Sequence, residues 1–432
     1  MCAQACISIP ETVARDKSQD PKRSQRLRPM VDPPQRLKIA MVTETYLPIK
    51  NGVDVLLLDL LPTLSQHADI TLFAPGLGGN KIQIEHINDH LKICRVPTVP
   101  LPIYAGYNMP IISSRRLRKL LEQEQPDIVH LHAPVLMGIQ ALRISKALSL
   151  PTVATYHTHL PEYTGHIMKG TLHKFVTRVA KSIVEKLIKY VFSQVDMVIT
   201  PTNIIKKLLE DYGVMAPVTH VPCGMDLNKY EYAGKEQGVK FRQEHNIPLE
   251  KPLVLYVGRI SFEKKLEHLL NAFVGISEAT LVIVGDGPSL NEYKKLAKTL
   301  GITDRVMFTG AIDHKSLGPV YHSADIFVSP SDTETFGLTF TEAMMCGIPP
   351  IGVDRLGPSE IIISGHNGYL VAPNNPEALA TKIRVLLHNP EIRRELGTQA
   401  KSDVRQYNTN NIAHKHMEVY HRVLERYNYG AW

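Results

Sequence analysis

The stretch SADIFVSPSDTETFGLTFTEAMMCGIPPIG, residues 323–352, decides the fold. It opens with an apolar run at 325–329, passes through a polar loop, and continues as a helical pattern over 338–345 before a second apolar run. A strand, a loop, a helix and another strand in this order are typical of a parallel sheet covered by helices. The loop carries Glu334 and the helix carries Glu342, so two carboxylates lie near one helix N-terminus.

The same alternation extends from this stretch toward the N-terminus. Further strands of the C-terminal half are expected at 253–257, 280–284 and 305–309, with helices between them. In the N-terminal half we expect strands at 38–43, 70–74, 128–131, 152–155 and 197–200. The sequence therefore predicts an α/β protein with two doubly wound parallel-sheet halves.

The length of 432 residues suits two domains. We expect an N-terminal domain over 37–221 and a C-terminal domain over 222–410, with a linker rich in proline, glycine and charge near the boundary. A last helix, 411–428, is expected to pack back on the N-terminal domain. Residues 1–36 are rich in Pro, Arg, Ser, Gln and Asp, which predicts a disordered basic extension.

The composition excludes several classes of protein. A hydrophobic content of 44% and a charged content of 21% are typical of a globular chain. No run approaches the roughly 18 apolar residues of a membrane-spanning helix, and no secretory signal is evident, so we expect a cytoplasmic protein. The five cysteines are scattered without a CxxC pair, which argues against a disulfide framework and a cysteine-based zinc site.

The net charge of +7 is unevenly distributed along the chain. The excess is +3 in residues 1–36, +5 in 37–222 and −1 in 223–432. A basic protein suggests nucleic acid or an anionic membrane as partner. The basic stretches lack interleaved aromatic residues, so we expect no nucleic-acid binding.

Ligands of open parallel sheets bind beyond the carboxyl ends of the strands, so the residues after each strand are candidates. Arg259 follows the strand at 253–257, and Lys264 and Lys265 open the next helix. Two cations beside free N–H groups suit a diphosphate, although a solvated helix start would look the same.

Two further loops of the C-terminal half carry candidate ligands. Gly285 and Gly287 form a tight GDGP turn that could let a ligand approach the backbone, although such turns often only connect a strand to a helix. Glu334 and Glu342 are suited to sugar and ribose hydroxyls, because a carboxylate accepts two hydrogen bonds in fixed geometry.

The N-terminal half contributes polar residues at equivalent places. Gly52 lies in a loop that opens a helix, and His132 follows the strand at 128–131. The strand at 152–155 is followed by His157, His159 and Tyr163. A zinc site would need ligands to which the sequence does not point, so no metal is expected.

These motifs in this order resemble the retaining GT-B glycosyltransferases of the large Glu-x7-Glu family, of family 4 type. That family includes sucrose-phosphate synthases, phosphatidylinositol mannosyltransferases and glycolipid synthases. The resemblance covers about residues 37–430 and rests on ETFGLTFTE (334–342), GRISFEK (258–264) and VGDGP (284–288). It implies the GT-B fold, in which two Rossmann-like domains face each other across a cleft, and a nucleotide sugar as donor substrate.

The resemblance also assigns roles to residues. Arg259 and Lys264 would hold the donor diphosphate, and Glu342 would bind the ribose hydroxyls. Glu334 would bind the transferred sugar, and His132 matches the catalytic-site histidine near the acceptor. The other donor-binding positions are Gly52, Gly285, Gly287, Phe336, Gly337 and Leu338.

The chain departs from the family pattern at two positions. Asn51 and Lys265 stand where many members have glycine. At the first position only Gly52 of the expected glycine pair carries over. At the second, two adjacent lysines compete for the role of diphosphate ligand.

A narrower resemblance concerns TETYLPIKNGV (43–53) and ATYHTHLPEY (154–163), which look like the branch of sulfoquinovosyldiacylglycerol synthases and related lipid α-glycosyltransferases. It implies transfer of a hexose, from a UDP-sugar, to a hydroxyl of a lipid such as diacylglycerol. His157, His159 and Tyr163 then become acceptor-side candidates. The alternatives are a soluble sugar or polyol acceptor, or a nucleotide-sugar epimerase.

Two basic segments bear on the acceptor. Residues 172–192 place apolar side chains at helical spacing with lysines and arginines between them, and Arg115, Arg116, Arg118 and Lys119 form a second cluster. One interpretation is a surface that docks on anionic lipid at the cytoplasmic face of the membrane. The other is a helix packed on its own sheet with its charges in water.

Overall fold

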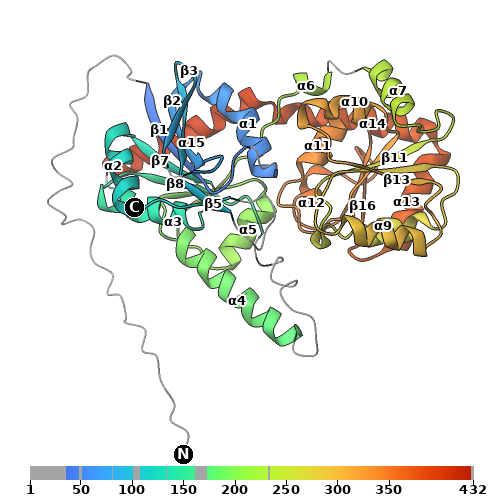
Figure 1. Ribbon diagram of the computed structural model, residues 1–432, viewed down its shortest axis with the longest axis horizontal. Helices are drawn as coiled ribbons and strands as arrows, with labels where there is room; N and C mark the ends of the chain where they lie inside the picture. Colours follow the sequence, from blue (N-terminus) through green and yellow to red (C-terminus); the bar gives the residue numbers. More distant parts are fainter. Residues whose placement is uncertain are drawn as a thin grey trace, which may run out of the picture.

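The computed structural model describes residues 36–47, 51–79, 81–100, 108–132, 134–159, 161, 173–231 and 234–429. The extension expected over 1–36 lies outside these residues, except for Arg36. Two α/β halves are visible in Figure 1. Each is built on a parallel sheet, which confirms the fold class predicted from the sequence.

The N-terminal half contains, in its described residues, an eight-stranded sheet of order β10-β9-β8-β7-β1-β2-β4-β3. All neighbouring pairs are parallel except β3 with β4, which is antiparallel at the edge. The strands are β1 (Leu37–Thr43), β2 (Ala68–Pro75), β3 (Gln83–Asn88), β4 (Leu91–Val96), β7 (Ile128–His132), β8 (Thr152–Thr155), β9 (Met197–Thr200) and β10 (Val218–His220). A separate antiparallel pair joins β5 (Thr98–Pro100) to β6 (Asn108–Pro110).

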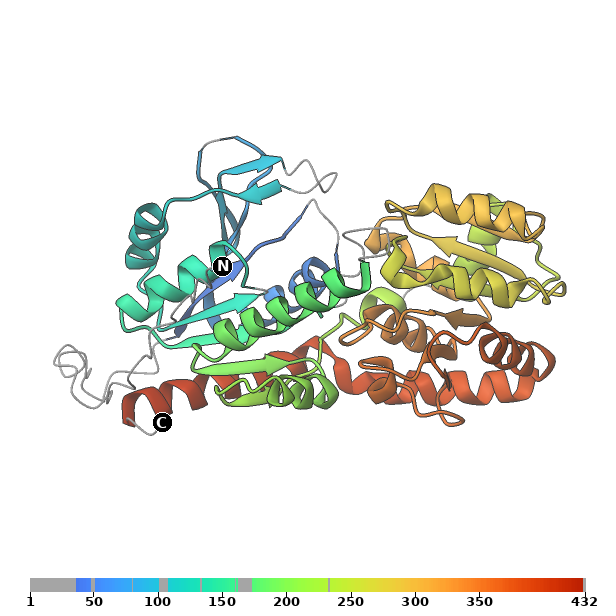
Figure 2. The same cartoon turned by 90° about the horizontal axis from the view of Figure 1, so that it is seen from below.

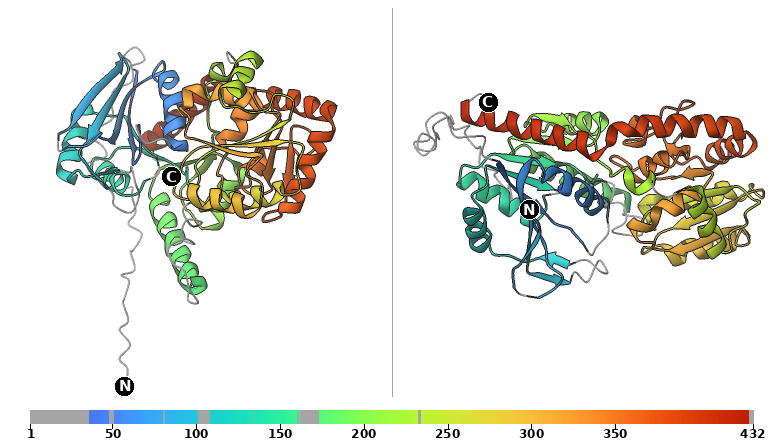
Figure 3. Two further views of the ribbon diagram at one scale, coloured as in Figure 1. Left: turned by 45° about the vertical axis from the view of Figure 1, so that its right-hand side comes forward. Right: turned by 90° about the horizontal axis from the view of Figure 1, so that it is seen from above.

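Helices cover both faces of this sheet (Figures 2 and 3). One hydrophobic core lies under α2 (Ser114–Glu124), α3 (Met137–Ala147), α4 (His173–Phe192) and α5 (Asn203–Asp211). On the other face a second core lies under α1 (Gly52–Leu64) and α15 (Thr409–Tyr429). Helix α1 begins with a capping box, in which the Asn51 side chain accepts from the backbone of Asp54 and the Asp54 side chain accepts in return.

The C-terminal half has a parallel sheet of order β13-β12-β11-β14-β15-β16 within the described chain. In chain order this is the 3-2-1-4-5-6 arrangement of nucleotide-binding doubly wound folds. Its strands are β11 (Leu253–Val257), β12 (Thr280–Val284), β13 (Val306–Gly310), β14 (Ile326–Val328), β15 (Pro350–Val353) and β16 (Tyr369–Val371).

Two hydrophobic cores also flank the C-terminal sheet. One is covered by α6 (Asn228–Glu231), α7 (Lys235–Glu244), α10 (Leu317–His322), α11 (Leu338–Met345), α12 (Pro358–Ile361) and α14 (Pro390–Val404). The other is covered by α8 (Leu266–Phe273), α9 (Leu290–Thr299) and α13 (Pro376–His388). Helix α11 spans the residues predicted for it, because its apolar side chains recur at helical spacing and Gly337 and Gly347 flank it.

The chain passes between the halves twice. Val221 belongs to an N-terminal core and Cys223 to a C-terminal core, and on the return Val404 and Ile412 lie in a C-terminal and an N-terminal core. Helix α15 leaves the C-terminal half and runs along the N-terminal half, as Figures 2 and 3 show. A short bridge between Met225 and residue 408 ties the two crossing segments together.

Helix α4 projects beyond the sheet of the N-terminal half in Figure 1. Ile188, Val191 and Phe192, near its C-terminal end, are buried in the core. Val179, Ile183, Leu187 and Tyr190 are 43–61% exposed. Among the described residues, no helix combines the length and apolar character needed to cross a membrane.

The crossing helix gives a first prediction. Ile412 is fully buried and contacts the backbone position of Gly224, where an added Cβ would lie 3.2 Å from the isoleucine. Ile412→Ala should lower the free energy of unfolding by about 2–5 kcal/mol, through lost burial and a cavity. Urea unfolding monitored by circular dichroism measures the change.

The exposed Glu418, on the same helix, provides the control. Glu418→Ala should leave the unfolding midpoint nearly unchanged. Equal midpoints for Ile412→Ala and the wild type would show that the helix does not stabilise the N-terminal half.

Candidate active site

The loops after β11 and β12 are packed against each other at the carboxyl edge of the C-terminal sheet. The Gly258 and Ile260 N–H groups donate to the carbonyls of Val284 and Asp286, at 3.0 and 2.9 Å. Gly285 has φ +146°, and a Cβ there would lie 1.9 Å from the Gly258 oxygen. The packing of the two loops therefore requires glycine at position 285 whether or not a ligand binds. At Gly287, a Cβ would similarly lie 2.2 Å from the backbone of Ile260.

Lys264 and Glu334 contact each other. The Lys264 ammonium donates to Glu334 Oε1 at 2.6 Å, and both side chains are about one fifth exposed. Arg259 is half-buried in the preceding loop, where its carbonyl accepts from the Tyr256 hydroxyl at 3.0 Å. The structure thus places a carboxylate and its cationic partner at the ends of β11 and β14, both within reach of solvent.

Lys265 has a different environment from Lys264. Its ammonium donates to Asp332 Oδ2 at 2.6 Å and to Asn374 at 2.8 Å, and Arg355 donates to the same Asp332 oxygen at 3.0 Å. Its φ of +53° lies in the left-handed region, which explains why glycine suits this position. Lys265 is therefore occupied in a structural ion-pair cluster, and Lys264 is the lysine beside Glu334.

The turn between β14 and α11 exposes a helix N-terminus beside Glu334. Gly337 has φ +106°, and a Cβ there would lie 2.7 Å from the Phe340 ring. No side chain caps α11 in the described structure, so its first N–H groups, which include that of Leu338, are available to an anion. The Phe336 ring lies in the core against Tyr407, so its side chain shapes the turn.

Glu342 is buried and held by two donors. The Tyr321 hydroxyl donates to Oε2 at 2.5 Å, and His314 Nε2 lies 3.1 Å from Oε1. The Tyr230 hydroxyl lies 3.2 Å from the same histidine nitrogen. Each carboxylate oxygen has two lone pairs, so both can still accept from a ligand. Burial alone would lower the pKa of His314, but its hydrogen bond to Glu342 and the negative charges of Glu342 and Asp59 together outweigh burial and raise the pKa above its ordinary value.

In the N-terminal half, two of the predicted histidines meet. His132 ends β7, and its Nδ1 lies 2.9 Å from His157 Nε2 in the loop after β8. His159 is buried and contacts the Tyr156 hydroxyl at 3.2 Å. Gly52 is the first residue of α1, with open space beside it. Tyr163 lies outside the described residues.

Thr335 connects the residues around Glu334 to the histidines of the N-terminal half. Its hydroxyl donates to the His157 carbonyl, and its own carbonyl accepts from the Thr202 hydroxyl at 3.2 Å. Nearby, the Glu360 carboxylate accepts from the Ile204 N–H at 3.1 Å across the same boundary. The carboxyl edges of the two sheets therefore meet beside Glu334.

Several residues of this arrangement were missed in the sequence analysis. His314 follows β13, so the strand-end rule would have found it. Tyr321 and Thr335 carry no comparable signal, since a tyrosine inside a helix and a threonine in a loop are common. Their contacts arise only from the tertiary fold.

Two family models match the chain. The model described as Glycosyltransferase Family 4 covers residues 50–229, and the model described as Glycosyl transferases group 1 covers residues 239–403. The alpha-monoglucosyldiacylglycerol synthase of Streptococcus pneumoniae is 31% identical over 73% of this chain and 70% of its own length. The chain belongs to this glycosyltransferase family. The family resemblance stated from the sequence is confirmed.

Another relative of the glycosyltransferase is the sulfoquinovosyl transferase of Arabidopsis thaliana, 32% identical over 71% of this chain. The matched region spans 59% of that protein, less than two thirds of its length. Both relatives correspond to the lipid branch named from the two N-terminal motifs.

Solved structures support the GT-B fold of the glycosyltransferase. Sucrose-phosphate synthase from Thermosynechococcus elongatus superposes with a TM-score of 0.73 at 22% identity, over 90% of this chain and all of that one. HepE of Anabaena, solved with UDP-glucose, gives a TM-score of 0.70 at 19% identity, over 89% and 99% of the two chains. At these identities the likeness concerns the fold.

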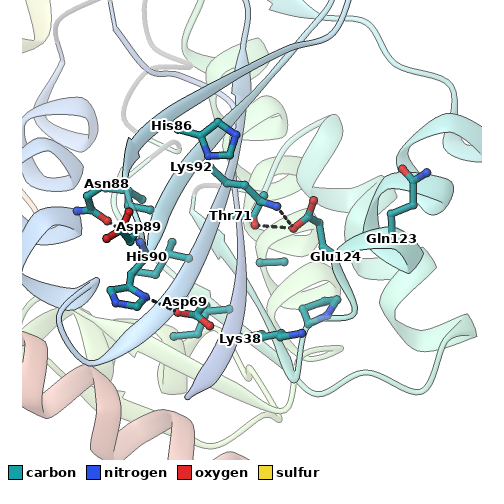
Figure 4. Close-up of a pocket in the computed structure, with 15 residues that line it drawn as sticks. Lys38, Asp69, Thr71, His86, Asn88, Asp89, His90, Lys92, Gln123 and Glu124 are labelled. Carbon is teal, nitrogen blue, oxygen red and sulfur yellow. Dashed lines mark hydrogen bonds and ion pairs between the residues drawn. The ribbon is translucent and has the colours of Figure 1, made fainter. Parts of the chain in front are cut away.

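A separate pocket of the glycosyltransferase lies at the amino ends of the strands of the N-terminal sheet (Figure 4). It is lined by the starts of β1, β2 and β4 and by the ends of β3 and α2, and several of its polar side chains are paired with one another. Lys92 and Thr71 both contact Glu124, at 2.7 and 2.8 Å, and His90 contacts Asp69 at 2.9 Å. Since it faces away from the carboxyl ends of the strands, it is distinct from the candidate active site.

The His314–Glu342 pair predicts how stability depends on pH. A histidine whose pKa rises above 6.5 on folding stabilises the fold fully below about pH 6.5, and this contribution is lost as the pH rises through the raised pKa. The difference in thermal unfolding midpoint between the wild type and His314→Asn should therefore be larger at about pH 6 than at about pH 9.

The exposed His421 serves as the control, since His421→Asn should show no such pH-dependent difference. Differences for His314→Asn that are equal at both pH values would contradict the assigned pair.

Proposed function

We propose that this glycosyltransferase moves a hexose from a UDP-sugar to a hydroxyl of a lipid such as diacylglycerol, with retention of anomeric configuration. The observation that carries the proposal is the contact between Lys264 and Glu334 at the uncapped N-terminus of α11. It places a phosphate-binding cation, free backbone N–H groups and a sugar-binding carboxylate together. The similarity to lipid glycosyltransferases favours the acceptor, and the fold of HepE, solved with UDP-glucose, is consistent with the donor.

Donor binding follows from these contacts. The diphosphate would lie between Arg259, Lys264 and the N–H groups of Gly337 and Leu338. With the phosphate as a second anion beside Lys264, Glu334 can turn its oxygens to the hydroxyls of the sugar. The ribose would hydrogen-bond to Glu342, whose position is set by Tyr321 and His314.

The remaining donor contacts come from both halves. Gly52 would approach the phosphates from α1, where the absence of a side chain leaves open space. Gly285 and Gly287 would shape the neighbouring wall through their tight packing. His159 and Tyr163 are retained as acceptor-side candidates.

The proposed reaction separates charge. The bond from the anomeric carbon to the diphosphate oxygen breaks, and the acceptor oxygen forms the new bond on the same face of the sugar. The acceptor proton passes to the departing phosphate, and Arg259, Lys264 and the α11 dipole stabilise the growing negative charge. His132 orients the reacting groups, and no metal or cofactor takes part, so transfer should persist in EDTA.

The exposed stripe on α4 supports a membrane surface as partner. Val179, Ile183, Leu187 and Tyr190 recur at helical spacing and are 43–61% exposed. A helix simply packed on its sheet would bury such a stripe. Basic residues flank it, including Arg178, Lys186 and Lys189, all exposed. We infer peripheral binding to anionic lipid at the cytoplasmic face, which would bring the acceptor close to the site.

The donor site is tested with Arg259→Ala and Glu334→Gln. Each should lower kcat by about 10²- to 10³-fold, because each removes a group that acts on the charge or geometry of the transition state. The measurement is transfer from UDP-glucose to diacylglycerol in mixed micelles. Arg394→Ala, at an exposed position on α14, is the control and should retain wild-type rates. Near wild-type rates for either site variant would refute its role.

The acceptor is tested by product mass after incubation with nucleotide sugars and either diacylglycerol or soluble sugars. We expect a glycosyldiacylglycerol with an α-linkage by NMR. A product found only with soluble sugars or polyols would replace the lipid assignment. Conversion of the donor without any acceptor would instead indicate an epimerase.

The membrane surface is tested by co-sedimentation with vesicles that contain phosphatidylglycerol. The double variant Ile183→Ser/Leu187→Ser should weaken binding at least about tenfold, since it removes two exposed apolar side chains from the stripe. Val274→Ser, at a position of the C-terminal half that is 44% exposed, is the control. High salt should also weaken binding, and equal sedimentation of all three proteins would exclude α4 as the docking element.

A further inference from the structure

A column of aromatic side chains runs through the N-terminal half behind the candidate active site. The rings of His157 and His132 are nearly parallel, with centroids 5.2 Å apart, and His130 lies 4.1 Å from His132 on the other side. Tyr420 of α15 then contacts His130, hydroxyl to Nδ1, at 2.7 Å. The column therefore connects the loop after β8 to the helix that crosses between the halves.

A single hydrogen bond joins the rings of His132 and His157. Burial lowers the pKa of His157 to about 3 and the pKa of His132 well below its ordinary value, so both rings are neutral near pH 7. A neutral imidazole carries a single N–H, and a hydrogen bond between His132 Nδ1 and His157 Nε2 needs one of the two nitrogens protonated. The partner on Nδ1 thus determines whether Nε2 of His132 carries its proton.

Nε2 of His132 is the atom left for the substrate. His132 is 1% exposed, and its Nε2 has no hydrogen-bond partner within the part of the chain that the structure describes. A buried ring nitrogen without a partner is costly, which is the expected condition of a group that a ligand completes. His132 also lies at the end of β7, at the edge where ligands of parallel sheets bind.

We propose that His157 is a positioning residue, which fixes the tautomer and ring orientation of His132 and leaves Nε2 of His132 to bind a hydroxyl of the reacting sugar or acceptor. The proposal rests on the proposed glycosyl transfer. It makes His157 the hydrogen-bond partner of His132, whereas the sequence led us to expect a contact between His157 and the acceptor.

The ring of His132 is supported from behind. His130 is fully buried, and its other nitrogen contacts the Thr155 hydroxyl at 2.7 Å, so both of its ring nitrogens are engaged. The ring of His132 lies between this fixed ring and that of His157. Its orientation is therefore set by packing against His130 and by the hydrogen bond between its Nδ1 and His157.

The donor-binding loop holds His157 in turn. The Thr335 hydroxyl donates to the His157 carbonyl, and Thr335 is adjacent to Glu334. The Thr202 hydroxyl anchors Thr335 at its own carbonyl. The sugar-binding carboxylate and His132 are consequently linked through a short chain of hydrogen bonds that crosses between the halves.

The test compares the full-length protein with variants at His157, His416 and Thr335. His157→Phe keeps the aromatic ring and removes the hydrogen bond, and should lower kcat on the order of 10- to 100-fold, as for other partners that orient a functional histidine. The dissociation constant for UDP, measured by calorimetry, should stay within about twofold, because His157 contacts the donor-binding loop through its backbone carbonyl, which the substitution leaves in place. His157→Gln, whose amide can hydrogen-bond to Nδ1, should recover part of the lost kcat.

His416→Phe is the matched control. His416 is a buried histidine of the same region that bonds to the Ile412 carbonyl and makes no hydrogen bond to His132. It should keep kcat near the wild-type value, so an equal loss in His416→Phe and His157→Phe would indicate packing alone and overturn the proposal. Thr335→Val should also lower kcat, and the double variant with His157→Phe should lose less than the product of the two effects.

A second readout does not depend on activity. In histidine-labelled protein, the ring ¹⁵N signals that vanish in His132→Asn identify His132. The wild type should show one protonated and one unprotonated ring nitrogen. In His157→Phe, exchange between the two tautomers should move both ¹⁵N shifts toward an intermediate value. A fixed tautomer in both proteins overturns the proposal even if transfer is confirmed. Averaging in His157→Phe without any transfer by the wild type would instead refute the proposed function alone.

Discussion

The hydrogen bonds of Thr335 are the constraint on which the arrangement of the site depends. This residue lies in the turn between β14 and α11, and it bonds to the His157 carbonyl through its hydroxyl and to the Thr202 hydroxyl through its own carbonyl. The turn itself requires the left-handed backbone of Gly337. As a result Glu334, the α11 N-terminus and the histidines of the other half lie at one place between the two sheets.

Much of this architecture could be predicted from local sequence. Strands of a parallel sheet that is covered by helices are buried on both faces, so each appears in the sequence as a run of about five apolar residues between amphipathic helices. The residues after these strands, Arg259, Glu334 and His132 among them, are brought to one edge by the topology alone. For this reason the fold class and the family were correct, and the roles of these residues remain proposals.

Other features depend on contacts between distant segments, and no local pattern reveals them. The ion pair of Lys264 with Glu334 and the pairing of Lys265 with Asp332 follow from backbone geometry at a left-handed residue. The strands β3, β5 and β6 were not expected, because exposed or very short strands have a weak apolar pattern. The buried strand β4 was also missed, since Lys92 and Arg95 interrupt its apolar run. The exposed stripe of α4 could not be told from a buried one, since periodicity gives a helix an apolar face without saying what covers it.

The central claim is that the donor lies at the N-terminus of α11, between Arg259, Lys264 and Glu342. A crystal structure of the protein with UDP tests it most directly. The account predicts the diphosphate against Arg259, Lys264 and the first N–H groups of α11, with the ribose hydroxyls on Glu342. UDP bound elsewhere, or bound there with its ribose turned away from Glu342, would contradict the account.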